Sequence, residues 1–169
     1  MTDSPVYIAV CGPDPAPEEV AAQCESVGRA IADAGALLVC GGLGGAMEAA
    51  ARGAAAAGGT VLGILPGADR DAANPFVTVA VPTGMGEMRN ALIVRTADAV
   101  IAVGGEFGTL SEIALALKAG TPVVGIGTWE LAKAGGRGTD DPIVRVETAD
   151  EAVATAIRLV RAGDRRGGS

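Results

Sequence analysis

Histidine is absent from the 169 residues, which removes the commonest general base and the commonest metal ligand. Lysine is almost absent, since Lys118 and Lys133 are the only two. Neither follows a glycine loop in the P-loop pattern, so Walker-type ATP hydrolysis is not expected. A pyridoxal enzyme needs a lysine for its Schiff base. Lys118 falls late in a predicted helix and Lys133 in a Gly-rich loop, so that chemistry is not expected either.

Cysteine is also scarce. The three cysteines, Cys11, Cys24 and Cys40, are too far apart in sequence for a zinc knuckle or a redox pair. We interpret them as reduced thiols of a cytoplasmic protein, and we predict no metal site. Cys11 and Cys40 end the first two predicted strands, where they are expected as small buried side chains.

Aromatic residues make up only 2% of the chain, so the core is expected to be aliphatic. No apolar run is long enough to span a bilayer, and residues 1–10 lack the features of a signal peptide. The net charge of −7, with 13 basic residues, is unsuited to binding a nucleic-acid backbone. We therefore expect neither a membrane nor a nucleic acid as a partner.

What is present is a regular alternation of short apolar runs with helical patterns. This alternation indicates βαβ units and a parallel sheet. The length suits one domain. We predict an α/β fold over residues 1–162, a single-domain Rossmann-like doubly wound parallel sheet with helices on both faces, followed by a disordered tail at 163–169. The predicted strands are 6–10, 36–40, 60–65, 77–81, 99–103, 123–126 and 143–146, and the predicted helices include 87–96, one that begins near Thr109 and one capped by Thr148 and Glu151.

Glycines gather where predicted strands end, at 41–45, 66–67 and 104–108. In an open parallel sheet ligands bind at the carboxyl ends of the strands. A strand that stops at Gly104 and Gly105 and reopens as a helix directs backbone N–H groups and the helix dipole at that edge. Such an arrangement holds an anion, and a phosphate is the usual one. A second interpretation of the last cluster is purely structural, because Thr109 and Glu112 also fit a capping box.

The dinucleotide fingerprint is missing. The first turn, from Cys11 to Asp14, has a single glycine, and Met47 occupies the third glycine position of an otherwise similar pattern after the second strand. No acidic residue is placed to hold a ribose, so NAD is not the expected ligand.

Four segments recur in a characteristic order: Gly-Gly-Leu-Gly-Gly-Ala-Met (41–47), Gly-Glu-Met-Arg-Asn (86–90), Ala-Asp-Ala-Val-Ile-Ala (97–102) and Gly-Gly-Glu-Phe-Gly-Thr-Leu-Ser-Glu (104–112). Over about residues 5–160 the chain resembles the Lonely Guy (LOG) or SLOG Rossmann-like superfamily, once labelled as possible lysine decarboxylases. The resemblance implies a homodimer or higher homo-oligomer that binds a nucleoside monophosphate or a similar phosphorylated ligand.

Two branches of that superfamily offer alternatives. In its phosphoribohydrolases, an arginine and a glutamate that match Arg89 and Glu112 cleave the N-glycosidic bond of a cytokinin monophosphate. Here Val103 replaces the proline of their motif, Gly86 and Glu87 replace Met-His, and Asn90 replaces a lysine. These forms look more like the molybdenum cofactor carrier branch, which holds a pterin monophosphate and catalyses nothing.

We therefore expect a carrier-like protein that binds an AMP-like nucleotide or the molybdenum cofactor. The alternative is a nucleoside 5′-monophosphate phosphoribohydrolase with Arg89 and Glu112 as the catalytic pair. Glu112 would stabilise an oxocarbenium-like state, although a capping role for Glu112 and a solvated position for Arg89 remain open. Single-stranded DNA binding, known for one relative of this fold, does not suit the charge or the few aromatic residues. The expected ligand-binding residues are Gly41, Gly42, Gly44, Gly45, Met88, Arg89, Asn90, Gly104, Gly105, Glu106, Phe107, Gly108, Thr109 and Glu112.

Overall fold

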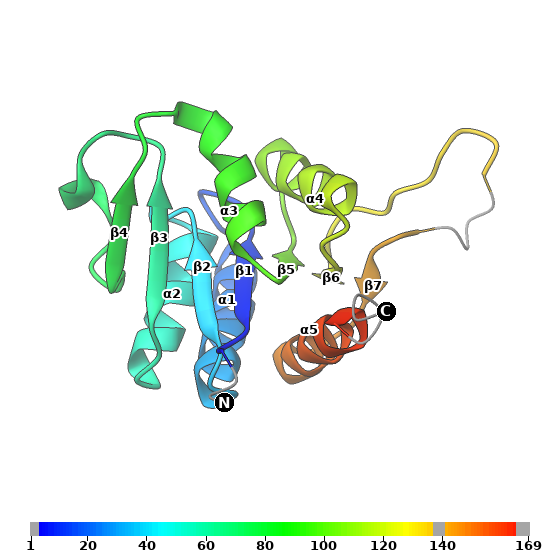
Figure 1. The fold of residues 1–169 in the computed structure, drawn as a ribbon, viewed down its shortest axis with the longest axis horizontal. Coiled ribbons are helices and arrows are strands. Elements are labelled where there is room, and N and C mark those ends of the chain that lie inside the picture. Colours follow the sequence, from blue (N-terminus) through cyan, green and yellow to red (C-terminus); the bar gives the residue numbers. More distant parts are fainter. Residues whose placement is uncertain (1–3, 137–140, 165–169) are drawn as a thin grey trace.

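The computed structural model describes residues 4–136 and 141–164. Its strands form one parallel sheet in the order β4-β3-β2-β1-β5-β6-β7, which confirms the predicted Rossmann-like α/β fold (Figure 1). Each strand lies where an apolar run predicted it. The strands are β1 (Tyr7–Cys11), β2 (Leu37–Cys40), β3 (Val61–Leu65), β4 (Val79–Pro82), β5 (Ala99–Val103), β6 (Val123–Ile126) and β7 (Val144–Arg145).

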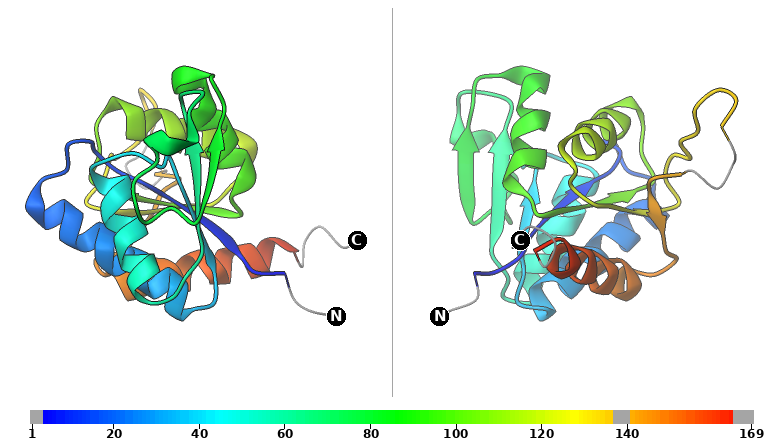
Figure 2. Two further views of the ribbon diagram at one scale, coloured as in Figure 1. Left: turned by 90° about the vertical axis from the view of Figure 1, so that its left-hand side faces the viewer. Right: turned by 45° about the vertical axis from the view of Figure 1, so that its right-hand side comes forward.

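Helices cover both faces of this sheet. They are α1 (Glu18–Asp33), α2 (Ala46–Ala56), α3 (Asn90–Thr96), α4 (Phe107–Ala119) and α5 (Ala149–Asp164), with short 3-10 turns η1 (Arg70–Ala72) and η2 (Gly86–Arg89). Helices α1, α2 and α5 share one apolar cluster with the sheet, and α3 and α4 share the other (Figure 2). Successive residues of β1 alternate between them, so Ile8 and Val10 lie on the face covered by α1, α2 and α5, while Ala9 and Cys11 lie on the face covered by α3 and α4.

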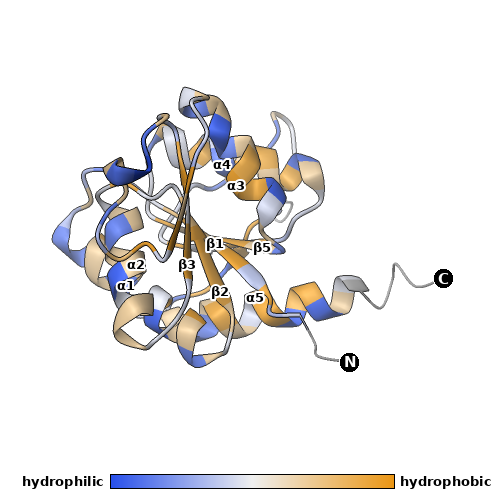
Figure 3. Cartoon of the chain, turned by 60° about the vertical axis from the view of Figure 1, so that its left-hand side comes forward, coloured by the Kyte–Doolittle hydropathy of each residue, from blue (hydrophilic) through white to orange (hydrophobic). Residues whose placement is uncertain are grey.

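The sheet interior is aliphatic, as the composition predicted, and the strands of its centre are the most hydrophobic elements (Figure 3). Every residue of β5 is fully buried. This explains the uninterrupted apolar run from Ala99 to Val103, since a central parallel strand is covered on both faces.

Two glycines let α1 and α2 cross at very short range. A Cβ placed on Gly28 would lie 1.9 Å from the carbonyl oxygen of Ala50, and one on Gly53 would lie 1.9 Å from that of Glu25. The alanine-rich face of α2 therefore packs against α1. This contact fixes where the N-terminal end of α2 meets the edge of the sheet.

The chain runs from β4, at one edge of the sheet, to β5 beside the central β1. This reversal creates a topological switch point between β1 and β5, where open parallel sheets bind ligands. Residues of η2 lie beyond the carboxyl ends of β3 and β4 (Figure 1), so they also overhang this edge.

Three local predictions were wrong. Helix α4 begins at Phe107, not at Thr109, and its N-cap residue Glu106 makes no side-chain capping bond. The segment expected as one helix over 87–96 is η2 followed by α3. Helix α5 reaches Asp164, so Gly163 and Asp164 are helical rather than part of a disordered tail, whose other residues, 165–169, lie outside the described range. The capping box of Thr148 and Glu151 is confirmed.

None of the helices in the described residues is long and apolar enough to cross a membrane.

Candidate functional site

A cleft of about 880 Å³ opens at the carboxyl edge of the sheet, beside the switch point. Its walls come from the end of β1, the β2–α2 connection, η2 with the start of α3, and the first turns of α4. Its lining comprises Val10 to Asp14, Leu43, Met47, Pro66, Glu87 to Ala91, Glu106 to Thr109, Ser111, Glu112 and Leu115. Segments far apart in sequence thus converge at the edge where the sequence placed the ligand.

The first turn of α4 supplies the polar floor of this cleft. The first backbone bond of the helix runs from the N–H of Leu110 to the carbonyl of Glu106. The N–H groups of Phe107, Gly108 and Thr109 donate to no acceptor among the described residues. The hydroxyl of Thr109, a residue only 3% exposed, is buried and also has no partner there. Four adjacent donors therefore lie without an acceptor at the positive end of a helix.

Gly104 and Gly105 shape this turn, but Gly104 does not contribute a free amide. The N–H of Gly104 donates to the carbonyl of Ile126 at 2.9 Å, so it belongs to the sheet. Gly105 has φ +119°, and a Cβ there would lie 2.5 Å from the side chain of Thr109. Glycine is needed at 105 because the chain turns sharply over Thr109.

The glycine cluster at 41–45 does not leave the N-terminal end of α2 free to bind an anion. The N–H of Ala46 donates to the carbonyl of Pro13 at 3.0 Å. A Cβ on Gly45 would lie 2.6 Å from that same carbonyl oxygen, and one on Gly44 would lie 3.3 Å from the carboxylate of Asp14. These glycines let the β1–α1 connection pack onto α2, so they build a wall of the cleft.

Gly41 and Gly42 lie deeper, at the end of β2, and both are buried. A Cβ on Gly41 would lie 2.4 Å from Nη1 of Arg89 and 2.5 Å from the sulfur of Met47. The carbonyl of Gly42 accepts from the N–H of Asn74 at 2.8 Å. Glycine at 41 is therefore required by the close approach of Arg89.

Arg89 is a buried arginine, 9% exposed, that ties η2 to the sheet. Its Nη1 donates to the carbonyl of Gly41 at 2.7 Å and to that of Ile64 at 2.5 Å. Burial lowers the pKa of the Arg89 guanidinium, and the nearby Glu112 raises it. The guanidinium lines the cleft. Its Nη1 bonds to the protein's own backbone, whereas its buried Nε has no partner among the described residues.

Glu112 lies on α4, one turn after the N–H groups of Phe107 and Gly108, and its side chain contacts Cys11. Burial raises the pKa of Glu112 to about 7, although its hydrogen bond with Cys11 and the charge of Arg89 act in the opposite direction. Burial and the neighbouring Glu112 raise the pKa of the Cys11 thiol well above its usual range. Glu112 therefore titrates near neutral pH, while Cys11 stays a thiol.

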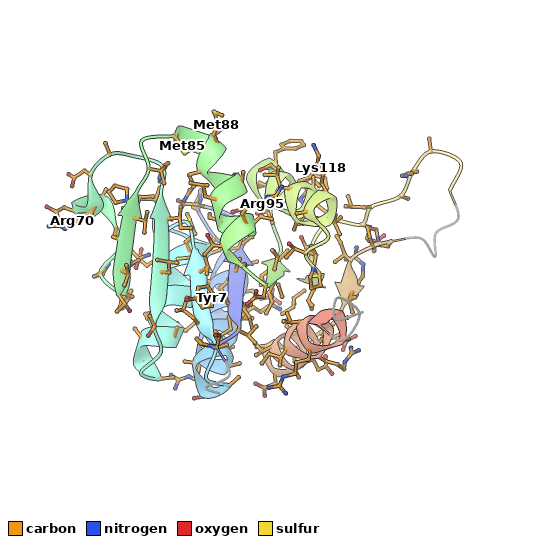
Figure 4. All side chains as sticks on the ribbon, viewed as in Figure 1. Tyr7, Arg70, Met85, Met88, Arg95 and Lys118 are labelled. Carbon is orange, nitrogen blue, oxygen red and sulfur yellow. The ribbon has the colours of Figure 1, made fainter. Side chains whose placement is uncertain are left out.

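The remaining expected residues lie at the rim. Met88 is 73% exposed and projects from η2, close to Met85 (Figure 4). The side-chain amide of Asn90 donates to the hydroxyl of Ser111 at 3.2 Å and links α3 to α4. Glu106 and Phe107 are exposed at the entrance to α4. The structure thus brings Met88 to Asn90, Glu106 to Thr109 and Glu112 to the cleft, while Gly41, Gly42, Gly44, Gly45, Gly104 and Gly105 stand behind its walls.

Several lining residues had not been expected from the sequence, notably Pro13, Asp14 and Glu87. Cys11 had been expected as a small buried side chain at a strand end, at the edge of the site. The order of the strands is what brings the end of β1 to the centre of this edge, beside β5. The sequence signal for these residues was their position, because Pro13 and Asp14 follow the end of a strand in a predicted parallel sheet, where ligands bind.

Fold and cleft together define a Rossmann-like α/β protein with a cleft at the switch point of its parallel sheet. The model of the SLOG cluster4 family matches residues 5–153, and the chain belongs to this family. This confirms the superfamily that the four sequence segments indicated.

The chain is similar to one curated relative and to several solved structures, of which those at 30% identity or more include molybdenum cofactor proteins. An uncharacterised protein of Archaeoglobus fulgidus is 46% identical over 121 residues, which cover 72% of this chain and 80% of that protein. The molybdenum cofactor binding protein of the phototrophic bacterium Rippkaea orientalis superposes with a TM-score of 0.80 at 30% identity, covering 95% of this chain and 98% of that one. A molybdenum cofactor carrier protein of Chlamydomonas reinhardtii gives a TM-score of 0.80 at 32% identity, covering 95% and 99%. DNA processing protein A of Helicobacter pylori, 18% identical with a TM-score of 0.69 over 92% of this chain and 81% of that one, shares the fold.

Proposed function

We propose that this protein binds a phosphorylated nucleotide-like ligand, of the nucleoside monophosphate or molybdopterin type, in the cleft over α4 and holds it as a carrier. One observation carries the proposal: the buried Thr109 hydroxyl has no partner in the described residues and stands beside the free N–H groups of Phe107 and Gly108. Buried polar groups are nearly always paired, so this cluster is suited to an incoming acceptor. The terminal oxygens of one phosphate group can accept from these donors together.

The charges around the cleft define how such a ligand is held. Its lining carries the carboxylates of Asp14, Glu87, Glu106 and Glu112 and the single guanidinium of Arg89. Among the described residues that line the cleft, Arg89 is the one basic side chain, so backbone amides and a hydroxyl would bind the phosphate. The carboxylates suit the other end of the ligand, because they accept hydrogen bonds from the amino and ring N–H groups of a purine or pterin.

The molybdenum cofactor is the favoured ligand because the named neighbours at 30% and 32% identity bind or carry it. Thr109 and the first-turn amides of α4 fit its phosphate. The bound group itself supplies the molybdenum centre. Within residues 4–136 and 141–164, no group of three His, Cys, Asp or Glu side chains is placed to hold a metal ion. The protein would therefore hold the phosphate and the ring, not the metal.

Two measurements test this proposal. The protein is purified from a host that makes the cofactor, and the small molecules that accompany it are identified by mass spectrometry. Isothermal titration with AMP and with molybdopterin then gives the affinities, with Thr109→Val as the matched variant. We expect binding that weakens in the variant. A folded protein that takes up neither ligand and purifies without one would contradict the proposal.

A second candidate is hydrolysis of a nucleoside 5′-monophosphate at its glycosidic bond. The observation that favours it is the pKa of about 7 at Glu112, because a carboxyl that titrates near neutral pH can exchange protons with a reacting group. Release of ribose 5-phosphate from AMP and from N6-prenylated AMP tests this activity. Turnover that survives Glu112→Ala would exclude Glu112 from the catalytic role.

We also propose that the protein is a homodimer or a higher homo-oligomer in the cytoplasm. The resemblance to the LOG superfamily is the support for the assembly. Light scattering coupled to size-exclusion chromatography measures the mass directly, and a monomer at micromolar concentration would contradict it.

A further inference from the structure

Half of the aromatic residues of this chain lie together at the mouth of the cleft. The sequence has one Trp, one Tyr and two Phe. Phe107 and Trp129 have ring centroids 5.6 Å apart and ring planes tilted by 39°. Phe107 lines the cleft and yet is 76% exposed. An exposed aromatic ring that lines a ligand-sized cleft is available for contact with a bound ligand.

Trp129 holds this ring in place. Its indole N–H donates to the carbonyl of Glu106 at 3.3 Å, directly before Phe107. Arg145 donates to the carbonyl of Trp129 at 2.5 Å, and the indole packs on the apolar cluster beneath α3 and α4. Trp129 is thus anchored from two sides and supports one side of the Phe107 ring. Most of the remaining ring surface stays accessible.

The ring and the proposed phosphate position belong to the same helical turn. Phe107 is the first residue of α4, and its own N–H is one of the donors without an acceptor. The exposed ring is therefore within reach of a ligand whose phosphate contacts these N–H groups. Planar heterocycles stack favourably on aromatic side chains, whatever their exact hydrogen-bonding pattern.

We infer that Phe107, supported by Trp129, is a stacking platform that selects phosphorylated ligands with a planar heteroaromatic ring over sugar phosphates that lack one. This inference rests on the proposed function and adds to it the residue that recognises the ring. A purine or a pterin fits the platform equally well. The phosphate would be bound by α4 and the ring by Phe107, so the two contributions can be separated by choice of probe.

The experiment compares AMP and GMP with ribose 5-phosphate by isothermal titration, so that the probes differ in the ring and share the phosphate. Phe107→Leu keeps an apolar side chain and removes the flat ring. Leu92→Ala is the matched control, because Leu92 is an exposed apolar residue of α3, 37% exposed, outside the cleft lining. We expect Phe107→Leu to weaken binding of AMP and GMP about tenfold and to leave ribose 5-phosphate unchanged. Leu92→Ala should change neither.

A second readout uses Trp129, the only tryptophan in the chain. Binding of AMP or GMP should alter its fluorescence in the wild type, and ribose 5-phosphate should not. If ribose 5-phosphate binds as well as AMP, or if Phe107→Leu weakens both probes equally, the platform is excluded while the phosphate site stands. If neither the nucleotides nor ribose 5-phosphate bind, molybdopterin is titrated into the wild type and into Phe107→Leu. Equal affinity of the two for molybdopterin excludes the platform alone, and absence of molybdopterin binding to the folded wild type overturns the proposed function as well.

Discussion

Arg89 donates a hydrogen bond from Nη1 to the backbone carbonyl of Gly41 at 2.7 Å, across the carboxyl edge of the sheet. The same nitrogen also donates to the carbonyl of Ile64. One guanidinium thereby joins η2 to the ends of β2 and β3, and this sets the wall of the cleft opposite α4. Arg89, which matches the catalytic arginine of the phosphoribohydrolases, therefore also holds the fold together.

The first prediction concerns that task. Arg89→Ala leaves two buried carbonyls without their charged donor, and we expect the free energy of unfolding to fall by about 2–4 kcal/mol. Urea denaturation measures this. Arg95→Ala on α3 is the control, since Arg95 is exposed (Figure 4) and its loss should cost less than about 0.5 kcal/mol. Equal stability of the two variants would show that the Arg89 link contributes nothing to the fold.

The second prediction concerns the unpartnered hydroxyl of Thr109. Thr109→Val removes a buried polar group without removing a hydrogen bond, so the ligand-free protein should be as stable as wild type or up to about 1 kcal/mol more stable. Affinity for AMP should fall about tenfold, because one donor to the phosphate is lost. Thermal unfolding and titration calorimetry check the two effects.

Thr83→Val provides the opposite case for comparison. The hydroxyl of Thr83 donates to the carbonyl of Leu65 at 2.7 Å, so its removal should destabilise the protein by about 1 kcal/mol. Loss of stability in Thr109→Val as large as in Thr83→Val would mean that the Thr109 hydroxyl is already paired in the ligand-free protein.

The third prediction concerns pH. The pKa of Glu112 is about 7 in the folded protein and 4.5 ordinarily, so the unfolded chain loses this proton at a lower pH than the folded chain does. Glu112 therefore lowers the free energy of unfolding as pH rises from about 4.5 to about 7, by at most about 3 kcal/mol, and the penalty is constant above that range. Glu112→Gln should remove this slope and be the more stable protein at pH 8.

Denaturant unfolding from pH 4.5 to 8 measures that difference against wild type. Glu130→Gln, at an exposed loop position, serves as the control and should follow the wild-type curve. Parallel curves for wild type and Glu112→Gln would show that burial does not disfavour the Glu112 carboxylate.

The fourth prediction concerns the crossing of α1 and α2. Gly28→Ala places a Cβ 1.9 Å from the carbonyl oxygen of Ala50, so the helices must move apart. We expect a loss of roughly 1–3 kcal/mol in the free energy of unfolding. Gly163→Ala on α5, where a Cβ meets nothing within 4 Å, should be neutral. Calorimetric melting of both variants decides whether this close packing matters.

The alternation of apolar runs with helical patterns was sufficient to predict the strands. The run from Ala99 to Val103 is β5, with the predicted bounds, because a doubly covered central strand must be apolar throughout. Thr148 and Glu151 formed the capping box expected of them. Thr109 and Glu112 have the same spacing and did not, because α4 begins at Phe107 and Glu112 contacts Cys11 of β1.

The glycine clusters at 41–45 and 104–108 looked alike in sequence, and each could have opened a helix toward an anion. Only their tertiary surroundings distinguish them. The carbonyl of Pro13 closes the start of α2, whereas the first turn of α4 keeps donors without acceptors in the described residues.

The sequence by itself determined the fold class, the edge of the sheet where the glycine-rich strand ends gather and the superfamily, because strands, strand ends and short motifs are encoded by neighbouring residues. Tertiary structure decided which helix terminus is open, what Arg89 bonds to, and that Phe107 meets Trp129. Those relationships join residues from separate strands and helices, and they exist only once the strand order puts β1 beside β5.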